Sequence, residues 1–393
     1  MPKEINKTKK KKAYKVRHKF WYGFLRKPAT WFLKIKFGYK FETARNLPEN
    51  YIVLSNHTTD FDPIFVGASF RKQMYFVASE HITRWNTAYK VLNHIFEPIV
   101  RYKGSIAATT VREILRKTKG GQNVCIFAEG VRSWTGETGD ILPSTAKLIK
   151  SAGCGLVTYR ISGGYFVSPN WSETKTRRGK VTGRQVAVYT KEQIAEMSED
   201  ELYDIIKKDL YENAYASQLT EKRRYKGKNL AERLENLVFI CPHCKKEETL
   251  VSSGNIIKCT KCEKEFTYNE YGMLDGIEYK TVLGLSEWQL TKVKEAVENN
   301  KKYTTPSATI YEVFPDHTKK QLATGKMVMD TKKITVEDIS FKTEEIVDLN
   351  IYGKRGLVFS QGKQFFEIII DKPYNAYKYV LYYKELCKLN EDK

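Results

Sequence analysis

Between residues 51 and 190, apolar runs alternate with segments whose spacing suits helices, and this alternation restricts the fold more than any other feature. The apolar runs are YIVLS, MYFVAS, NVCIFAEG and GLVTYRISG. Strands that are apolar on both faces occur in parallel or mixed sheets that helices cover on both sides. The sequence therefore predicts an α/β domain with a mixed, mostly parallel sheet covered by helices.

Two segments, one between these runs and one after them, carry helix signals of their own. Residues 109–119 have the spacing of an amphipathic helix, which the following Gly-Gly pair would end. Residues 198–212 open with Ser198 and, three residues later, Glu201, which together form a capping box. Both segments support the alternation of strands and helices.

The character of the chain changes after residue 225. A segment with paired cysteines follows, and from residue 306 onward short strand patterns dominate until a final helical stretch. Strands followed by one helix resemble a pleckstrin-homology-like domain in the order of their elements. We expect four regions: a basic amphipathic segment (1–45), an α/β domain (46–225), a cysteine module (226–276) and a β-rich C-terminal domain (277–393).

The chain is strongly basic, with 67 Lys and Arg against 46 Asp and Glu. Residues 1–45 hold 15 Lys and Arg and two Glu, a net charge of +13 out of a total of +21. Large apolar residues recur among these cations: Phe20, Trp21, Phe24, Leu25, Trp31, Phe32, Ile35 and Phe37. Basic helices with such an apolar face bind the surface of anionic membranes, and we expect this segment to do so.

Pro28 predicts a break that divides the N-terminal segment into two short helices. No apolar run approaches the ~18 residues that a spanning helix needs, and no signal-peptide cleavage site follows the lysines. A solvated basic arm, or an arm that binds nucleic acid, is the alternative interpretation.

The seven cysteines divide into two groups. Cys125, Cys154 and Cys387 are scattered, as buried thiols usually are. The other four are paired in a C-x2-C-x14-C-x2-C pattern: Cys241, Cys244, Cys259 and Cys262. Each pair offers two thiolates to one tetrahedral zinc ion, and four thiolates close its coordination shell. We therefore expect a structural zinc ribbon, in a chain whose lack of a disulfide framework suits a reducing cytoplasm.

Polar clusters follow two of the apolar runs. His57 and Asp62 come just after YIVLS, and the stretch EGVRS comes just after NVCIF. In open α/β sheets functional groups gather beyond the carboxyl ends of strands, so both clusters would face one cleft if the strands are parallel neighbours. His57 and Asp62 can touch only if His57 lies in the turn and Asp62 in the first turn of a helix.

In that arrangement Asp62 would hold one imidazole nitrogen of His57, and the other nitrogen would take a proton from an attacking hydroxyl. A merely polar turn is the alternative. The sequence has no Gly-x-Ser-x-Gly elbow for a serine nucleophile. Direct attack by a substrate hydroxyl is therefore the simpler scheme.

These stretches resemble the sequence blocks of the glycerolipid acyltransferases, the family of the lysophosphatidic acid acyltransferases. NHTTDFD is similar to the first block, NH(x)4D, and FAEGVRS to the third block, Phe-Pro-Glu-Gly-Thr-Arg-Ser. FEPIVRYKGS and GLVTYRISG resemble the second and fourth blocks. The order and the spacing match over residues 45–190.

The resemblance implies a reaction and two catalytic residues. His57 would be the general base and Asp62 the carboxylate that orients it. An acyl group would pass from a thioester, acyl-CoA or acyl carrier protein, to a glycerol hydroxyl, with no metal and no covalent acyl-enzyme. Zinc would remain a structural ion in the separate cysteine module.

The resemblance also implies an acceptor site. Glu129, Gly130, Arg132 and Ser133 would shape this site, and Arg101 would join Arg132 in holding a phosphate. Surface ion pairs are the alternative role for the two arginines.

Several positions depart from the usual blocks. Ala128 and Val131 replace the Pro and Thr of the third block, and Thr158 replaces the Pro of the fourth. The catalytic pair is intact, so a lysophospholipid other than lysophosphatidic acid is an alternative acceptor.

We expect an acyltransferase that acts on a lysophospholipid, with lysophosphatidic acid giving phosphatidic acid as the leading reaction. It would be cytoplasmic and peripheral on the inner face of the cell membrane, with an anionic membrane surface and acyl carrier protein as partners. The alternatives are a membrane-docking adaptor and a nucleic-acid-binding zinc-ribbon protein, both without catalysis. Binding of nucleic acid would leave His57 and Asp62 without a role.

Overall fold

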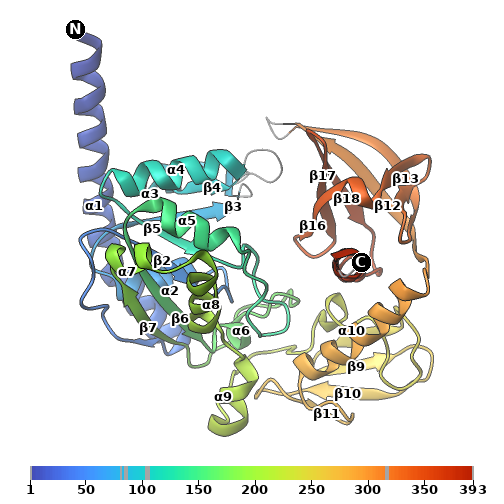
Figure 1. Ribbon diagram of the computed structural model, residues 1–393. Coiled ribbons are helices and arrows are strands. Elements are labelled where there is room, and N and C mark those ends of the chain that lie inside the picture. The colour runs from blue at the N-terminus through green and yellow to red at the C-terminus, as the bar shows by residue number, and fades with distance from the viewer. Residues whose placement is uncertain (1, 80–81, 84–86, 102–106, 315–317, 392–393) are drawn as a thin grey trace. The chain divides into compact units, whose positions relative to one another are not determined.

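The computed structural model describes residues 2–79, 82–83, 87–101, 107–314 and 318–391, with side chains from Val16 onward. The chain forms two compact units, which are treated separately below (Figure 1). The first unit comprises the described residues up to 226 except 171–175. The second comprises 171–175 and the described residues from 227 onward.

A seven-stranded sheet forms the centre of the first unit, in the order β1-β7-β6-β2-β5-β3-β4 (Figure 1). Its strands are β1 (Lys40–Phe41), β2 (Tyr51–Ser55), β3 (Met74–Ser79), β4 (Ile99–Arg101), β5 (Asn123–Phe127), β6 (Gly155–Ser162) and β7 (Thr182–Tyr189). Every neighbouring pair is parallel except β6 and β7, which are antiparallel. The structure thus confirms a mixed, mostly parallel sheet.

Helices cover both faces of this sheet. They are α1 (Pro2–Phe37), α2 (Asp62–Ser69), α3 (Thr87–Phe96), α4 (Ala107–Lys119), α5 (Ser144–Ala152), α6 (Gly164–Val167), α7 (Lys191–Glu196), α8 (Glu199–Leu210) and α9 (Ala214–Glu221). On one face Ile52 joins Ile149 of α5 and Ile206 of α8 in a buried cluster. On the other face the ring of Tyr51 lies 5.9 Å from that of Phe70, just after α2. Alternate residues of β2 therefore point to opposite layers, as in a fully buried strand.

The N-terminal segment is one helix, so the predicted division at Pro28 is wrong. α1 continues through Pro28 to Phe37. Proline removes only one backbone N–H, and packing holds the helix on both sides of it: Tyr22 and Leu33 are buried, and the Tyr22 hydroxyl donates to the Gly67 carbonyl at 3.0 Å. Among the described residues, no helix combines the length and the apolar character that crossing a bilayer requires.

The second unit begins with a small antiparallel sheet in the order β11-β10-β9-β8. Its strands are β8 (Leu250–Ser253), β9 (Ile256–Cys259), β10 (Glu265–Tyr268) and β11 (Leu274–Asp275). The paired cysteines lie in this part, which has the short strands of a ribbon. The helix α10 (Val282–Glu298) follows and had not been expected from the sequence.

A second seven-stranded sheet completes the unit, in the order β15-β14-β13-β12-β18-β17-β16, and all its pairs are antiparallel. Its elements are β12 (Tyr303–Val313), β13 (Lys319–Met329), β14 (Lys333–Val336), β15 (Ile339–Lys342), β16 (Ile346–Tyr352), β17 (Gly356–Gln361), β18 (Gln364–Ile370) and the final helix α11 (Tyr377–Glu391). The structure confirms a β-rich C-terminal region that ends in one helix, the order on which the likeness to pleckstrin-homology domains rests.

The segment that leads into the ribbon packs in the hydrophobic core of this larger sheet. Phe239, just before the first cysteine pair, belongs to the buried cluster that contains Ile310 of β12. Its backbone N–H donates to Gln289 Oε1 of α10 at 2.7 Å. The buried Lys378 of α11 forms an ion pair with Glu248 of the ribbon at 2.8 Å. These contacts tie the cysteine segment to both helices of the second unit.

Candidate active site and metal centre

The two polar turns predicted to share a cleft lie side by side at the carboxyl ends of β2 and β5. The strands are parallel neighbours, with Ser55 opposite Phe127. His57 and Glu129 each follow two residues later, and the His57 N–H donates to Glu129 Oε1 at 2.6 Å. The Ser133 N–H donates to the His57 carbonyl at 2.9 Å. The second turn therefore holds the first by its backbone.

His57 and Asp62 are in direct contact. Nδ1 of His57 lies 2.8 Å from Oδ2 of Asp62, which is fully buried at the first position of α2. Two threonines complete the coordination of this carboxylate: the backbone N–H groups of Thr58 and Thr59 donate to Oδ2 at 2.5 and 2.9 Å, and their hydroxyls donate to Oδ1 at 3.1 and 3.0 Å. Asp62 is therefore fixed before any substrate arrives.

One face of the His57 imidazole packs on an aromatic ring, and the side chain remains partly exposed to solvent. Its ring stacks on Phe127, with centroids 4.5 Å apart and planes 23° apart. The side chain is 20% exposed. Within the described part of the chain Nε2 has no hydrogen-bond partner. The nitrogen remote from Asp62 is thus available to a ligand.

Glu129 is engaged on both carboxylate oxygens by backbone groups. Besides the His57 contact, Oε2 accepts the Gly139 N–H at 2.6 Å. Burial raises the pKa of the Glu129 carboxyl to about 8, against the opposing effect of these two hydrogen bonds. Glu129 therefore links the turns after β2 and β5 to the loop that precedes α5.

Arg101 reaches the same turn from the end of β4. Gly130 has a φ of +69°, and a Cβ on it would lie 2.4 Å from Arg101 Nη1. The backbone conformation favours glycine here, and the missing Cβ leaves room for the guanidinium group. The rest of the predicted second block, from residue 102, lies outside the described residues.

Arg132 and Ser133 have different surroundings. Nη1 of Arg132 lies 3.2 Å from Oδ2 of Asp60, and the two side chains are 19% and 77% exposed. The Ser133 hydroxyl donates to the Glu137 carbonyl at 2.6 Å and accepts the Gly136 N–H at 2.9 Å. Arg132 is thus largely buried beside a competing, exposed carboxylate, whereas the Ser133 hydroxyl closes its own turn.

Several contributors were not singled out from the sequence. Thr58 and Thr59 hold Asp62, Phe127 supports the imidazole, and Gly139 engages Glu129. The threonines lie within NHTTDFD, where their hydroxyls come three and four residues before a buried acid, which is a local signal. No local sequence signal pointed to Gly139, because its partner Glu129 is ten residues away.

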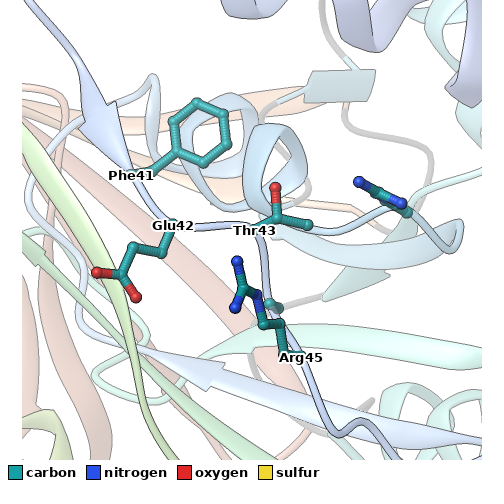
Figure 2. A pocket seen from close by; sticks show the side chains of 6 residues that line it. Phe41, Glu42, Thr43 and Arg45 are labelled. Atoms are coloured by element: carbon teal, nitrogen blue, oxygen red, sulfur yellow. The ribbon is translucent and has the colours of Figure 1, made fainter.

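A separate hollow of 470 Å³ lies beyond the other end of α2 (Figure 2). It is lined by Phe41, Glu42, Thr43, Ala44, Arg45 and Arg71. The Ala44 N–H donates to the carbonyl of Ser69, the last residue of α2, at 2.9 Å. Because Asp62 begins that helix, the hollow and the His57 turn are at opposite ends of it, and the hollow contains none of the predicted site residues.

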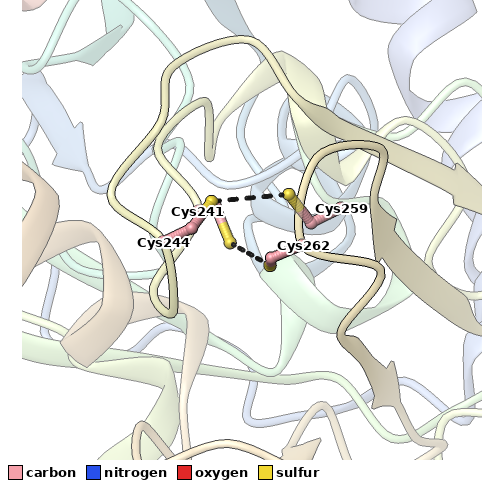
Figure 3. A group of neighbouring side chains, drawn as sticks. All are labelled: Cys241, Cys244, Cys259 and Cys262. Atoms are coloured by element: carbon pink, nitrogen blue, oxygen red, sulfur yellow. Dashed lines mark hydrogen bonds between the residues drawn. The ribbon is translucent and has the colours of Figure 1, made fainter.

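The four paired cysteines converge in the second unit (Figure 3). Their sulfur atoms all lie within 4.8 Å of one another; Cys241 and Cys262 are 3.8 Å apart, and Cys244 and Cys259 are 3.7 Å apart. A tetrahedron with zinc–sulfur bonds of about 2.3 Å has edges of about 3.8 Å. The Lys261 N–H also donates to Cys259 Sγ at 3.4 Å, a contact that favours a thiolate. The cluster fits a four-coordinate metal ion.

Two comparisons with known proteins give matches. Residues 38–162 match the protein family described as Acyltransferase. This match confirms the resemblance to acyltransferases seen in the sequence blocks. Four solved chains match; one is the crystal structure of the 1-acyl-sn-glycerophosphate (LPA) acyltransferase from Thermotoga maritima, with 22% identity, a TM-score of 0.44 and coverage of 55% of this chain and 85% of that chain. A comparison with curated proteins gives no match.

Proposed function

We propose that this protein transfers an acyl group from an acyl thioester to the free hydroxyl of a lysophospholipid, with lysophosphatidic acid as the leading acceptor. The contact of 2.8 Å between His57 Nδ1 and the fixed carboxylate of Asp62 carries this proposal. It lies in the domain that matches the acyltransferase family. The donor would be acyl-CoA or acyl carrier protein.

The geometry supports a general-base mechanism. Asp62 accepts the Nδ1–H of His57, so the lone pair of the ring lies on Nε2. Nε2 takes the proton of the acceptor hydroxyl as its oxygen attacks the thioester carbonyl. The tetrahedral intermediate then collapses, the carbon–sulfur bond breaks, and His57 returns the proton to the leaving thiolate. Asp62 stabilises the imidazolium between these two steps.

The acceptor phosphate would bind beside the turn of Gly130. Arg101 reaches that turn, and Arg132, two residues after Gly130, is partly exposed beside Asp60. A guanidinium group can engage two phosphate oxygens at once. Gly130 leaves room for this approach, whereas the engaged hydroxyl of Ser133 supports the turn instead of the ligand.

We propose that α1 holds the protein on the cytoplasmic face of the membrane. One side of the helix packs on the first unit through buried residues, whereas the following apolar side chains are exposed: Val16, Phe20, Phe24, Trp31, Phe32 and Ile35. Lys19, Lys27 and Lys34 are also exposed on the same helix. An amphipathic helix rich in lysine suits anionic phospholipids, among which the acceptor would be found.

We propose that the cysteine cluster holds a structural zinc ion. Cys241, Cys244, Cys259 and Cys262 would be its ligands, and zinc bound by four thiolates would supply folding energy. Phe239 and Ile240, just before the first cysteine pair, pack in the core of the larger sheet, so zinc binding would also stabilise that sheet.

Acyl transfer from acyl-CoA and from acyl carrier protein to a panel of lysophospholipids tests the proposal. Wild type should transfer, and His57→Ala should lower the rate to background, with the best acceptor identifying the reaction. No transfer by folded wild type with any pair of substrates would contradict it. Lipid binding without transfer would then favour the adaptor, and steeply salt-dependent binding of nucleic acid that survives His57→Ala would favour the nucleic-acid alternative.

A further inference from the structure

Glu129 connects three segments of the first unit through backbone hydrogen bonds. Oε1 accepts from His57 at the end of β2, and Oε2 accepts from Gly139 in the loop before α5, both at 2.6 Å. The residue itself follows β5. The side chain therefore bridges backbone N–H donors from two other segments.

The surroundings of Glu129 do not suit a residue that holds an acceptor or its arginines. In the described part of the chain Glu129 makes no ion pair with Arg101 or Arg132, and the acid paired with Arg132 is Asp60. Both oxygens of Glu129 are instead directed to the protein backbone. Glu129 therefore does not orient either arginine for phosphate binding.

We propose that Glu129 is a positioning residue, which fixes the backbone of His57 for proton transfer and does not bind the acceptor. This inference rests on the proposed function of His57 as the base. Glu129 holds the His57 N–H, and the Ser133 N–H holds its carbonyl at 2.9 Å. Asp62 fixes the ring. The backbone and Nδ1 of His57 are thus held by three hydrogen bonds, which limit the movement of Nε2. Small displacements of a reacting group lower rates steeply.

Two substitutions test this role kinetically. Glu129→Gln keeps the size of the side chain but turns an amide NH2 toward one of two N–H donors, so one hydrogen bond is lost. We expect kcat, measured at pH 9 where the Glu129 carboxyl is ionised, to fall roughly 10- to 100-fold with the acceptor KM unchanged. Glu137→Gln is the matched control. Glu137 lies in the same loop as Gly139, and its carboxyl accepts from the Tyr211 hydroxyl instead of from His57. The kcat of this variant should stay at the wild-type value.

Gly139→Ala perturbs Glu129 from a distance and guards against misfolding of the first variant. The added Cβ would lie 3.3 Å from Glu129 Oε2, so the carboxylate must move by a few tenths of an ångström. We expect a smaller fall in kcat, again without a change in KM. A rise in the acceptor KM with kcat preserved in either variant would overturn the inference, because it would place Glu129 on the substrate.

A readout without catalysis separates this inference from the proposed function. Labelling histidine with 15N gives backbone amide signals for the six histidines of the chain, and the signal of His57 is assigned by its loss in His57→Ala. An ionised carboxylate moves the proton of a bonded amide further downfield than a neutral amide oxygen does. At pH 9, Glu129→Gln should therefore shift the His57 signal upfield whichever of the two donors its oxygen keeps, and Glu137→Gln should not. A His57 signal that does not move in Glu129→Gln overturns the positioning role. If the signal moves in that variant but wild type transfers no acyl group, only the enzymatic proposal is overturned.

Discussion

The carboxylate of Asp62 lies 2.8 Å from Nδ1 of His57 because the chain leaves β2 in a turn and starts α2 at Asp62. Within one straight helix, five residues rotate through about 500°, and the two side chains would not share a face. The intervening threonines close the turn around the carboxylate. The orientation of His57 is therefore produced locally, by seven consecutive residues from Asn56 to Asp62.

Asp62→Asn should keep this turn but lose the charge that orients and stabilises the imidazolium. We expect kcat to fall on the order of 10²- to 10⁴-fold, as an amide can hold the wrong ring tautomer. Thr59→Ser, which retains the hydroxyl bonded to Asp62, should remain within a fewfold of wild type. Steady-state acyl transfer measures both variants, and a kcat within threefold of wild type for Asp62→Asn would contradict the assigned role.

Asp60 should weaken the binding of phosphate to Arg132. Its carboxylate occupies Arg132 at 3.2 Å and is itself mostly exposed, so the pair contributes about 0.2–1 kcal/mol. Asp60→Asn should therefore lower the KM for a phosphomonoester acceptor by roughly 1.5- to 5-fold and leave kcat unchanged. Arg132→Gln should raise the same KM. Equal KM values for wild type and Asp60→Asn would show that Arg132 does not hold the phosphate.

The sequence predicted the sheet and the turn of His57 because both depend on local patterns. Apolar runs indicated buried strands, and the NH(x)4D spacing placed His57 in a turn and Asp62 in a helix. The single helix α1 was not predicted, because long-range packing of Tyr22 and Leu33 outweighs the local effect of Pro28. Contacts such as Gly139 with Glu129 depend on the path of a loop, which no short pattern encodes.

In the second unit, one helix could have been predicted from the sequence, but its long-range contacts could not. The buried positions of α10, among them Val282, Leu285, Gln289 and Val293, recur at helical spacing, so the signal was present although the helix was not predicted. The role of Gln289 was beyond prediction, since its amide bonds with backbone groups about 50 residues away. The contacts of Gln289 join α10 to the segment before the ribbon, and they form only in the folded unit.

Glu129 should make stability depend on pH. Burial raises its folded-state pKa to about 8 from an ordinary 4.5, so between these values the native state retains a proton that the unfolded chain has released. The contribution of Glu129 is therefore fully present below pH 4.5 and is lost as pH rises toward 8. Urea unfolding at pH 5 and pH 8 should show a smaller loss of stability for Glu129→Gln than for wild type. Equal losses in the two proteins would contradict the raised pKa.

Removal of the metal should destabilise the second unit as a whole. Structural zinc supplies about 10 kcal/mol or more of binding free energy in small modules, and Phe239 and Ile240, just before the first cysteine pair, pack in the core of the larger sheet. Cys259→Ser should reduce the zinc content below one per chain and lower the thermal midpoint. Cys387→Ser, which changes a thiol of α11 outside the cluster, should retain the metal. Metal analysis that finds full zinc in Cys259→Ser would contradict four-cysteine ligation.

The exposed face of α1 should govern attachment to membranes. Phe20, Phe24 and Trp31 are 62%, 60% and 69% exposed, and each would bury apolar surface in a bilayer interface. The triple substitution of these residues by Ser should weaken partitioning onto phosphatidylglycerol vesicles by roughly 100-fold or more, since full burial of one such side chain contributes about 1.5–3 kcal/mol. Leu219→Ser, a matched change at an exposed apolar residue of α9, should have no effect. Sedimentation with vesicles measures the binding, and undiminished binding of the triple variant would assign attachment to another part of the chain.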